Sequence, residues 1–186
     1  MKQFIKHTIE SAPEASKELL KYGEKKYGLL PNLFRYMAGA PAALEAYNKL
    51  FNTFSKTSFT PGEQHLILLS VSVINNCDYC TAAHTRAAKA NGMPSSILNA
   101  VRKQKILSDT RLNTLIETAQ KITYTRGNIT GDDLTDFYKE GFSPENVLEI
   151  IVAISLKTLS NYINHITENS INDALLPFAV GNEIED

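Results

Sequence analysis

Helical periodicity is the dominant pattern in this chain of 186 residues. Apolar residues recur at the spacing of helix faces almost everywhere, and no run alternates with a period of two between turn residues. Proline and glycine mark where helices begin and end, as at Gly28 and Pro41. The pattern predicts helices over about 12–27, 31–37, 41–56, 64–74, 77–90, 94–103, 109–125 and 132–139, and a long apolar one opened by 143–145. We therefore predict an all-α fold.

Length and charge narrow the class of protein. A chain of this length suits one domain with a sizeable core that needs no disulfide. Nineteen Lys and Arg residues oppose twenty Asp and Glu residues, which argues against nucleic acid as a partner. The N-terminus lacks a signal peptide pattern, and no apolar run approaches the length of a membrane span. We expect a cytoplasmic protein with no membrane partner.

The centre of the sequence carries the clearest helix start. Thr60 suits the N-cap position, Pro61 the first turn and Glu63 the third position, where its side chain can reach back in a capping box. The helix that follows is apolar on nearly every face and therefore belongs in the core. Asn75-Asn76 then breaks the run, so Cys77 and Cys80 should lie in the first turn of the next helix.

Two segments of the chain resemble each other. Residues 60–92 and 143–169 both open with a hydroxyl residue followed by proline, continue through an apolar run and end in a matched spacing. Cys77, Cys80 and His84 of the first segment correspond to Thr158, Asn161 and His165 of the second. We interpret residues 1–186 as one domain with an internally duplicated helix pair, in which only the first copy kept its sulfurs.

Both cysteines of the chain lie in the stretch "NNCDYCTAAH". On a helix Cys77, Cys80 and His84 point along one face, where the positive helix end favours a thiolate. His84 can take the proton of Cys80 or hydrogen-bond its thiolate. Such a pair can attack a peroxide, form a sulfenic acid and resolve it as a disulfide. We expect Cys80 to attack first and Cys77 to exchange with an external reductant.

Two other interpretations use the same residues. Zinc would accept both thiolates and His84, but a structural site needs a fourth ligand, and only a coincidence of the fold could bring His65 or His165 there. Two buried cysteines beside a core histidine would be inert. We predict no metal and no cofactor.

The stretch from Glu63 to Gly92, "EQHLILLSVSVINNCDYCTAAHTRAAKANG", closely resembles the core of the carboxymuconolactone decarboxylase superfamily in its alkylhydroperoxidase, AhpD-like branch. The ending "KTLSNYINHITEN" is similar to the C-terminal repeat of that branch. The resemblance implies an AhpD-like helical fold and a homo-oligomer, often a trimer or hexamer. It also implies a CxxC-dependent peroxidase of antioxidant defence, which reduces alkyl hydroperoxides and is re-reduced by a dithiol or a lipoyl protein.

The proton relay departs from the resemblance. Well-understood members place a glutamate about three turns before the first cysteine, where this chain has His65. His65 is one candidate for the distant proton acceptor, and a relay of His84 with water is the other. Glu63 lies two residues earlier, and helix capping is its alternative role. Glu149 could face the site as a base, or belong to an exposed stripe or subunit contact.

Two further functions stay open at this point. The family name suggests a second activity, that of a lyase that decarboxylates a lactone acid. Such a lyase does not need a redox-active pair of cysteines. A redox-sensing oligomer would form the disulfide without rapid turnover. Dependence of activity on both cysteines separates the peroxidase from the lyase.

Overall fold

The computed structural model describes residues 3–185, and all of the regular secondary structure in this range is helical. The all-α prediction is confirmed, and the helix bounds lie within a few residues of the predicted ones. The helices are α1 (Glu14–Tyr27), α2 (Asn32–Met37), α3 (Pro41–Phe54), α4 (Pro61–Ile74), α5 (Asp78–Ala90), α6 (Ser95–Arg102), α7 (Thr110–Thr125), η1 (Asp132–Leu134), α8 (Thr135–Lys139), α9 (Pro144–Ile166) and η2 (Asp173–Phe178). The short helix η2 was not predicted.

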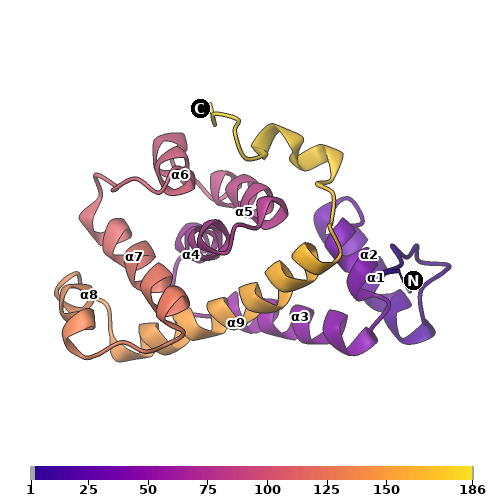
Figure 1. Cartoon of the computed structure of the whole chain (residues 1–186), viewed down its shortest axis with the longest axis horizontal. Coiled ribbons are helices and arrows are strands. Elements are labelled where there is room, and N and C mark those ends of the chain that lie inside the picture. The colour runs from indigo at the N-terminus through magenta and orange to yellow at the C-terminus, as the bar shows by residue number, and fades with distance from the viewer. Residues whose placement is uncertain (1–2, 186) are drawn as a thin grey trace.

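Helices α4 and α5 lie at the centre of the molecule (Figure 1). The predicted capping box opens α4: the Glu63 N–H donates to the Thr60 hydroxyl, and the Glu63 carboxylate accepts from the Thr60 N–H at 2.8 Å. Most of α4 is buried, as its apolar faces predict. Ser70 and Ser72 are tolerated there because their hydroxyls donate to carbonyls of the preceding turn.

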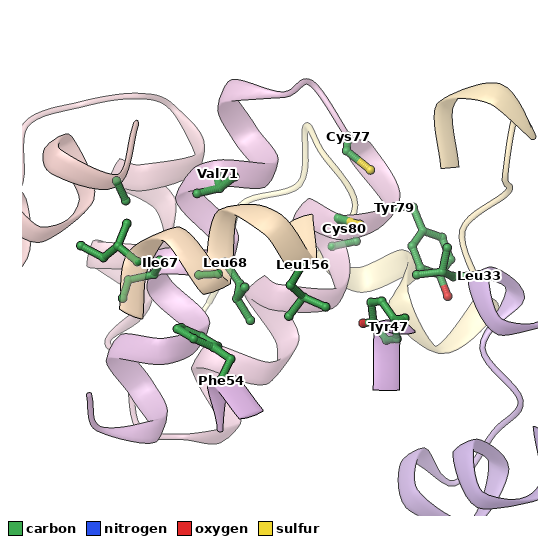
Figure 2. Packing of buried hydrophobic residues seen from close by; sticks show 14 of the residues in the cluster. Leu33, Tyr47, Phe54, Ile67, Leu68, Val71, Cys77, Tyr79, Cys80 and Leu156 are labelled. Carbon is green, nitrogen blue, oxygen red and sulfur yellow. The ribbon is translucent and has the colours of Figure 1, made fainter. Parts of the chain in front are cut away.

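The two cysteines belong to the main hydrophobic core. Figure 2 shows Cys80 near Tyr79, and Leu68 and Leu156 belong to the same cluster of buried residues. A second, smaller cluster around Leu98 joins α4, α6 and α7. Both cysteine side chains are therefore buried rather than displayed on the surface.

Helix α9 runs across the molecule beside α3 and α4 (Figure 1). By length and composition its 23 residues could span a bilayer, so the statement that no apolar run is long enough was wrong. One face of α9 packs on α3 and α4 and is buried, as at Ile150 and Leu156. Core helices pass the same test of length and composition, and α9 is packed as a core helix on this face.

The two similar segments differ in backbone conformation. Residues 60–92 form the helix pair α4–α5, whereas 143–169 form the single helix α9. In the first segment Asn76 adopts a left-handed conformation with φ 54° and ends the helix. Its counterpart in the second segment is Lys157, a good helix former, so the helix continues. The internal duplication itself stays a prediction.

Candidate active site

The turn between α4 and α5 positions the cysteines. Asn76 reverses the chain, and the N–H of Cys77 donates to the Ser72 carbonyl at 3.0 Å. Cys77 is thereby the N-cap of α5, and Cys80 is the third residue of its first turn. The predicted place of both cysteines at the start of a helix is confirmed.

Helix α9 supplies polar partners to the sulfurs. The two cysteines lie 3.4 Å apart, and both side chains are buried. The amide of Asn164 donates to Cys80 Sγ at 3.1 Å and lies 3.7 Å from Cys77 Sγ. The Ser160 hydroxyl lies 3.9 Å from Cys80 Sγ. The amide and the hydroxyl can stabilise negative charge on Cys80.

Lys157 is the unexpected component of this site. Its side chain is 1% exposed, and its Nζ donates to His84 Nε2 at 2.9 Å. Among residues 3–185 no carboxylate pairs with it. A buried ammonium without a counter-charge is strongly unfavourable. The thiolate of Cys80 supplies that counter-charge, and the charge of Lys157 in turn lowers the pKa of Cys80.

The environment separates the pKa values of the two thiols. Burial raises the pKa of Cys80, but the hydrogen bond from Cys77 and the charge of Lys157 more than offset it, lowering the pKa to about 5. The Cys77 pKa is raised, because its thiol donates that hydrogen bond and is buried. At neutral pH the pair therefore consists of a Cys80 thiolate and a Cys77 thiol.

His65 and His84 continue the polar chain away from the sulfurs. Because the Lys157 ammonium only donates, His84 Nε2 accepts, and the proton of His84 lies on Nδ1. That nitrogen lies 3.4 Å from His65 Nδ1. Burial, then the charges of Lys157 and Lys26, lower the pKa of His65 to about 4. Burial, Lys157 and His65 likewise lower the pKa of His84. Both imidazoles are therefore neutral at pH 7.

The structure corrects the predicted role of His84. Among the described residues no hydrogen bond joins His84 to Cys80, and the imidazole meets Lys157 instead. Burial lowers its pKa well below the usual value. In the structure His84 therefore contacts Lys157 rather than the sulfur.

The two candidate carboxylates of the sequence analysis, Glu63 and Glu149, do not lie at the cysteine site. Glu63 completes the capping box and pairs with Arg111, so capping is its observed role and it does not join His65 and the cysteines. Glu149 accepts hydrogen bonds from the backbone and hydroxyl of Ser58 and tethers that loop to α9. Among residues 3–185 no group of three or more His, Cys, Asp or Glu side chains is gathered as a metal site.

Tyr79 and His165 lie in opposite surroundings. Tyr79 packs in the core, and its hydroxyl donates to Asn172 at 2.8 Å. His165, the counterpart of His84 in the second segment, is exposed. Its neighbour Asn164 occupies the inward position and reaches the cysteines.

A cavity of about 450 Å³ opens onto this arrangement. Cys80, His84, His65 and Lys157 line it, whereas Cys77 does not. Aromatic side chains form part of its wall: Tyr27, Tyr47, Phe51 and Tyr79. Only Cys80 of the two sulfurs is therefore placed to meet a molecule in the cavity.

The segment that carries the cysteines is similar to a known protein family. Residues 40–108 match the model of the carboxymuconolactone decarboxylase family, and this segment contains α4, α5 and both cysteines. Through this segment the chain is similar to the carboxymuconolactone decarboxylase family. No curated protein matches the chain.

Solved structures share the fold of this chain. A peroxidase-related AhpD-core protein of Ralstonia eutropha JMP134 superposes with a TM-score of 0.84 at 19% identity, over 95% of this chain and 97% of its own. A peroxidase-related protein of Silicibacter sp. TM1040 reaches 0.78 at 19% identity, over 98% and 97%. The debrominase Bmp8, in complex with 2,3,4-tribromopyrrole, reaches 0.75 at 16% identity, over 96% of both chains. The AhpD-like fold is thereby confirmed.

Sequence analysis missed the contribution of α9 to the site. Lys157, Ser160 and Asn164 meet the cysteines there, although the second segment was interpreted mainly as scaffold. One pattern could have pointed to them: a lysine in a long apolar run, followed by polar residues at helical spacing. A charge in such a run needs a partner when the helix packs.

The buried histidines predict acid-sensitive folding. Because the folded pKa of His65 lies below its unfolded value, the unfolded state binds more protons between pH ~6.5 and ~4. The free energy of unfolding should therefore fall as the pH falls through this window, by up to about 1.4 kcal/mol per pH unit and group. Urea unfolding at several pH values should show a smaller slope for His65→Gln and an unchanged one for the exposed His165→Gln. Equal slopes for wild type and His65→Gln would contradict the assignment.

Proposed function

We propose that this protein is a CxxC-dependent peroxidase that reduces alkyl hydroperoxides with Cys80 as the attacking thiolate. One observation carries the proposal: a buried lysine, with no carboxylate partner among residues 3–185, lies beside a cysteine that lines a ligand-sized cavity. A buried thiolate–ammonium pair of this kind suits a reactive cysteine better than a structural one.

The first chemical step uses the charge pair. The Cys80 thiolate attacks the terminal oxygen of the hydroperoxide, so that an S–O bond forms and the O–O bond breaks. The electron pair leaves on the alkoxide, and the Lys157 ammonium gives it a proton to form the alcohol. Cys80 is then a sulfenic acid. His84 holds the Lys157 Nζ in place during this transfer.

The second step closes the disulfide. The Cys77 thiol lies beside Cys80 and attacks its sulfur, and the hydroxyl leaves as water with the proton of Cys77. In sum, two thiols and one hydroperoxide give a disulfide, an alcohol and water. A dithiol or a lipoyl protein then supplies two electrons and restores the Cys80 thiolate, the Cys77 thiol and the Lys157 ammonium.

Counting thiols tests this function. Reduced protein is treated with less than one equivalent of cumene hydroperoxide, and the remaining thiols are counted. We expect two thiols lost per peroxide within seconds, with recovery on addition of dithiothreitol. Thiols that ignore the peroxide would refute the proposal, and activity that survives in the double variant Cys77→Ser/Cys80→Ser would favour the lyase. Slow oxidation without turnover would favour the redox sensor.

One observation also favours a second reaction at the same thiols. The aromatic wall of the cavity suits a flat ring, and Bmp8 is a debrominase with a bound tribromopyrrole. In such a reaction a ring C–Br bond is replaced by a C–H bond while two thiols form a disulfide. One bromide ion and one proton are released, so the reaction balances. Release of bromide from 2,3,4-tribromopyrrole by reduced protein would identify this activity, and its absence would exclude it.

We propose further that the protein is a homo-oligomer, a trimer or hexamer, whose contact uses the outer face of α9. Ile151 and Tyr162 on α9 and Tyr124 on α7 are exposed around a second cavity of about 580 Å³. Apolar surface of this kind favours a protein contact. The double variant Tyr124→Glu/Tyr162→Glu should lower the mass in sedimentation velocity, whereas Tyr138→Glu on α8 should not. A monomeric wild type would contradict this assembly.

A further inference from the structure

The charges that line the active-site cavity are all of one sign. Lys26, Arg86 and Lys157 contribute cationic groups to its wall, and no Asp or Glu of the described chain lines it. Lys157 is buried beside Cys80, whereas the Lys26 and Arg86 side chains are exposed. The cavity therefore has one cation at its reactive end and two at its solvent side.

The two outer cations lack acidic partners. Within residues 3–185 neither Lys26 nor Arg86 forms a salt bridge. Lys26 Nζ instead lies over the Phe51 ring, 4.5 Å from its centre, and 5.5 Å from the centre of the Tyr27 ring. Both rings line the cavity. An aromatic platform holds the ammonium close to the cavity without neutralising it.

The wall between the charged ends is largely apolar. Its aliphatic part is formed by Leu29, Leu33, Ala83, Ala87 and Leu175. The volume suits an organic ligand far larger than hydrogen peroxide. A molecule that satisfies both features has a hydrocarbon body and an anionic end.

We infer that the cavity binds amphipathic carboxylates, and that the natural substrate is the hydroperoxide of an organic acid. The carboxylate lies at the solvent side between Lys26 and Arg86, the hydrocarbon body contacts the apolar wall, and the O–O bond reaches Cys80 Sγ. The redox part of this inference rests on the proposed function, whereas the binding part does not. The two cations recognise the charge, and the apolar wall excludes short or strongly polar acids.

Binding of a redox-inert acid tests the site without turnover. Titration calorimetry compares octanoate with octanol on reduced protein at low salt. We expect octanoate to bind at least tenfold more tightly, an advantage that shrinks at high salt. The double variant Lys26→Gln/Arg86→Gln should lose this advantage. The matched control Lys25→Gln/Lys105→Gln removes two exposed lysines that do not line the cavity and should keep it.

Measuring hydroperoxide turnover gives a second test of the same two cations. With a fatty-acid hydroperoxide, kcat/KM relative to its value with neutral cumene hydroperoxide should fall about tenfold or more in Lys26→Gln/Arg86→Gln, whereas this ratio should not change in Lys25→Gln/Lys105→Gln. Equal binding of octanoate and octanol, or an equal loss in the control variant, would overturn the anion site. Octanoate binding through these cations in a protein that consumes no hydroperoxide would instead refute the proposed function and retain the site. If Lys26→Gln/Arg86→Gln slowed only the re-reduction of the disulfide, the two cations would serve to bind the reductant. That result would overturn the inference.

Discussion

Replacing Lys157 by methionine is expected to slow peroxide consumption by about 100-fold or more at neutral pH. The substitution removes the counter-charge of the Cys80 thiolate and the proton donor to the leaving alkoxide. Proton donation alone contributes on the order of 10²–10⁴ in such steps. The pKa of Cys80 should rise from about 5 toward or above that of an ordinary thiol, because burial is then opposed by fewer groups.

The absorbance of the thiolate near 240 nm reports this pKa directly. The chain has no Trp residue whose absorbance would interfere at this wavelength. Lys157→Arg is the matched control, since it keeps the charge but cannot give up its proton. It should keep the thiolate and still lose rate. A Lys157→Met protein with an unchanged Cys80 pKa would refute the ion pair.

The stability of Lys157→Met separates its chemical role from a structural one. Methionine resembles lysine in length and removes the buried ammonium. Because the pKa of Cys80 then rises, this thiol takes up a proton at neutral pH and no unpaired charge stays buried. We expect the midpoint of thermal unfolding to stay level or rise while the rate falls. A large loss of stability would indicate that Lys157 serves the fold instead.

Replacing Cys80 by serine is expected to abolish peroxide consumption. A serine hydroxyl is neither ionised near neutral pH nor able to accept the oxygen, so no intermediate forms. Cys77→Ser should behave differently: it keeps the attacking thiolate, consumes one peroxide and stops, because no thiol is left to resolve the sulfenic acid. Stopped-flow measurement of peroxide loss distinguishes zero, one and many turnovers. Full activity of Cys80→Ser would reverse the assigned order of attack.

Local signals made the helices and the cysteine turn predictable. The capping box at Thr60 and Glu63 depends on residues three apart, and Asn76 ends α4 within a few residues of both cysteines. Such features follow from the chain itself and hold in the structure. The AhpD-like arrangement of these helices was available through the resemblance of residues 63–92 to a known family.

The partners of the sulfurs could not be predicted in this way. They depend on how α9 is rotated against α5, and that rotation is set by packing of the whole core. The matched spacing pointed to His165, but the helix turns Asn164 and Lys157 inward and leaves His165 exposed. A shift of one residue moves a side chain by about 100° around a helix, which is enough to exchange the two faces.

The surroundings of His65 could not be predicted for the same reason, because they depend on how the helices pack. The position expected for a glutamate holds His65, which does approach His84, as the spacing along α4 allowed. The cation beside Cys80, Lys157, comes from another helix, α9. Sequence spacing therefore indicated that His65 and His84 are neighbours but not that Lys157 meets them.

Whole-protein mass spectrometry of the Cys77→Ser variant tests the central claim most directly. The variant is mixed with one equivalent of cumene hydroperoxide at pH 7 and quenched within seconds. Our account predicts one added oxygen atom per chain, located on Cys80 by dimedone labelling and absent from Lys157→Met quenched at the same time. An unmodified Cys80 in the Cys77→Ser protein would contradict it.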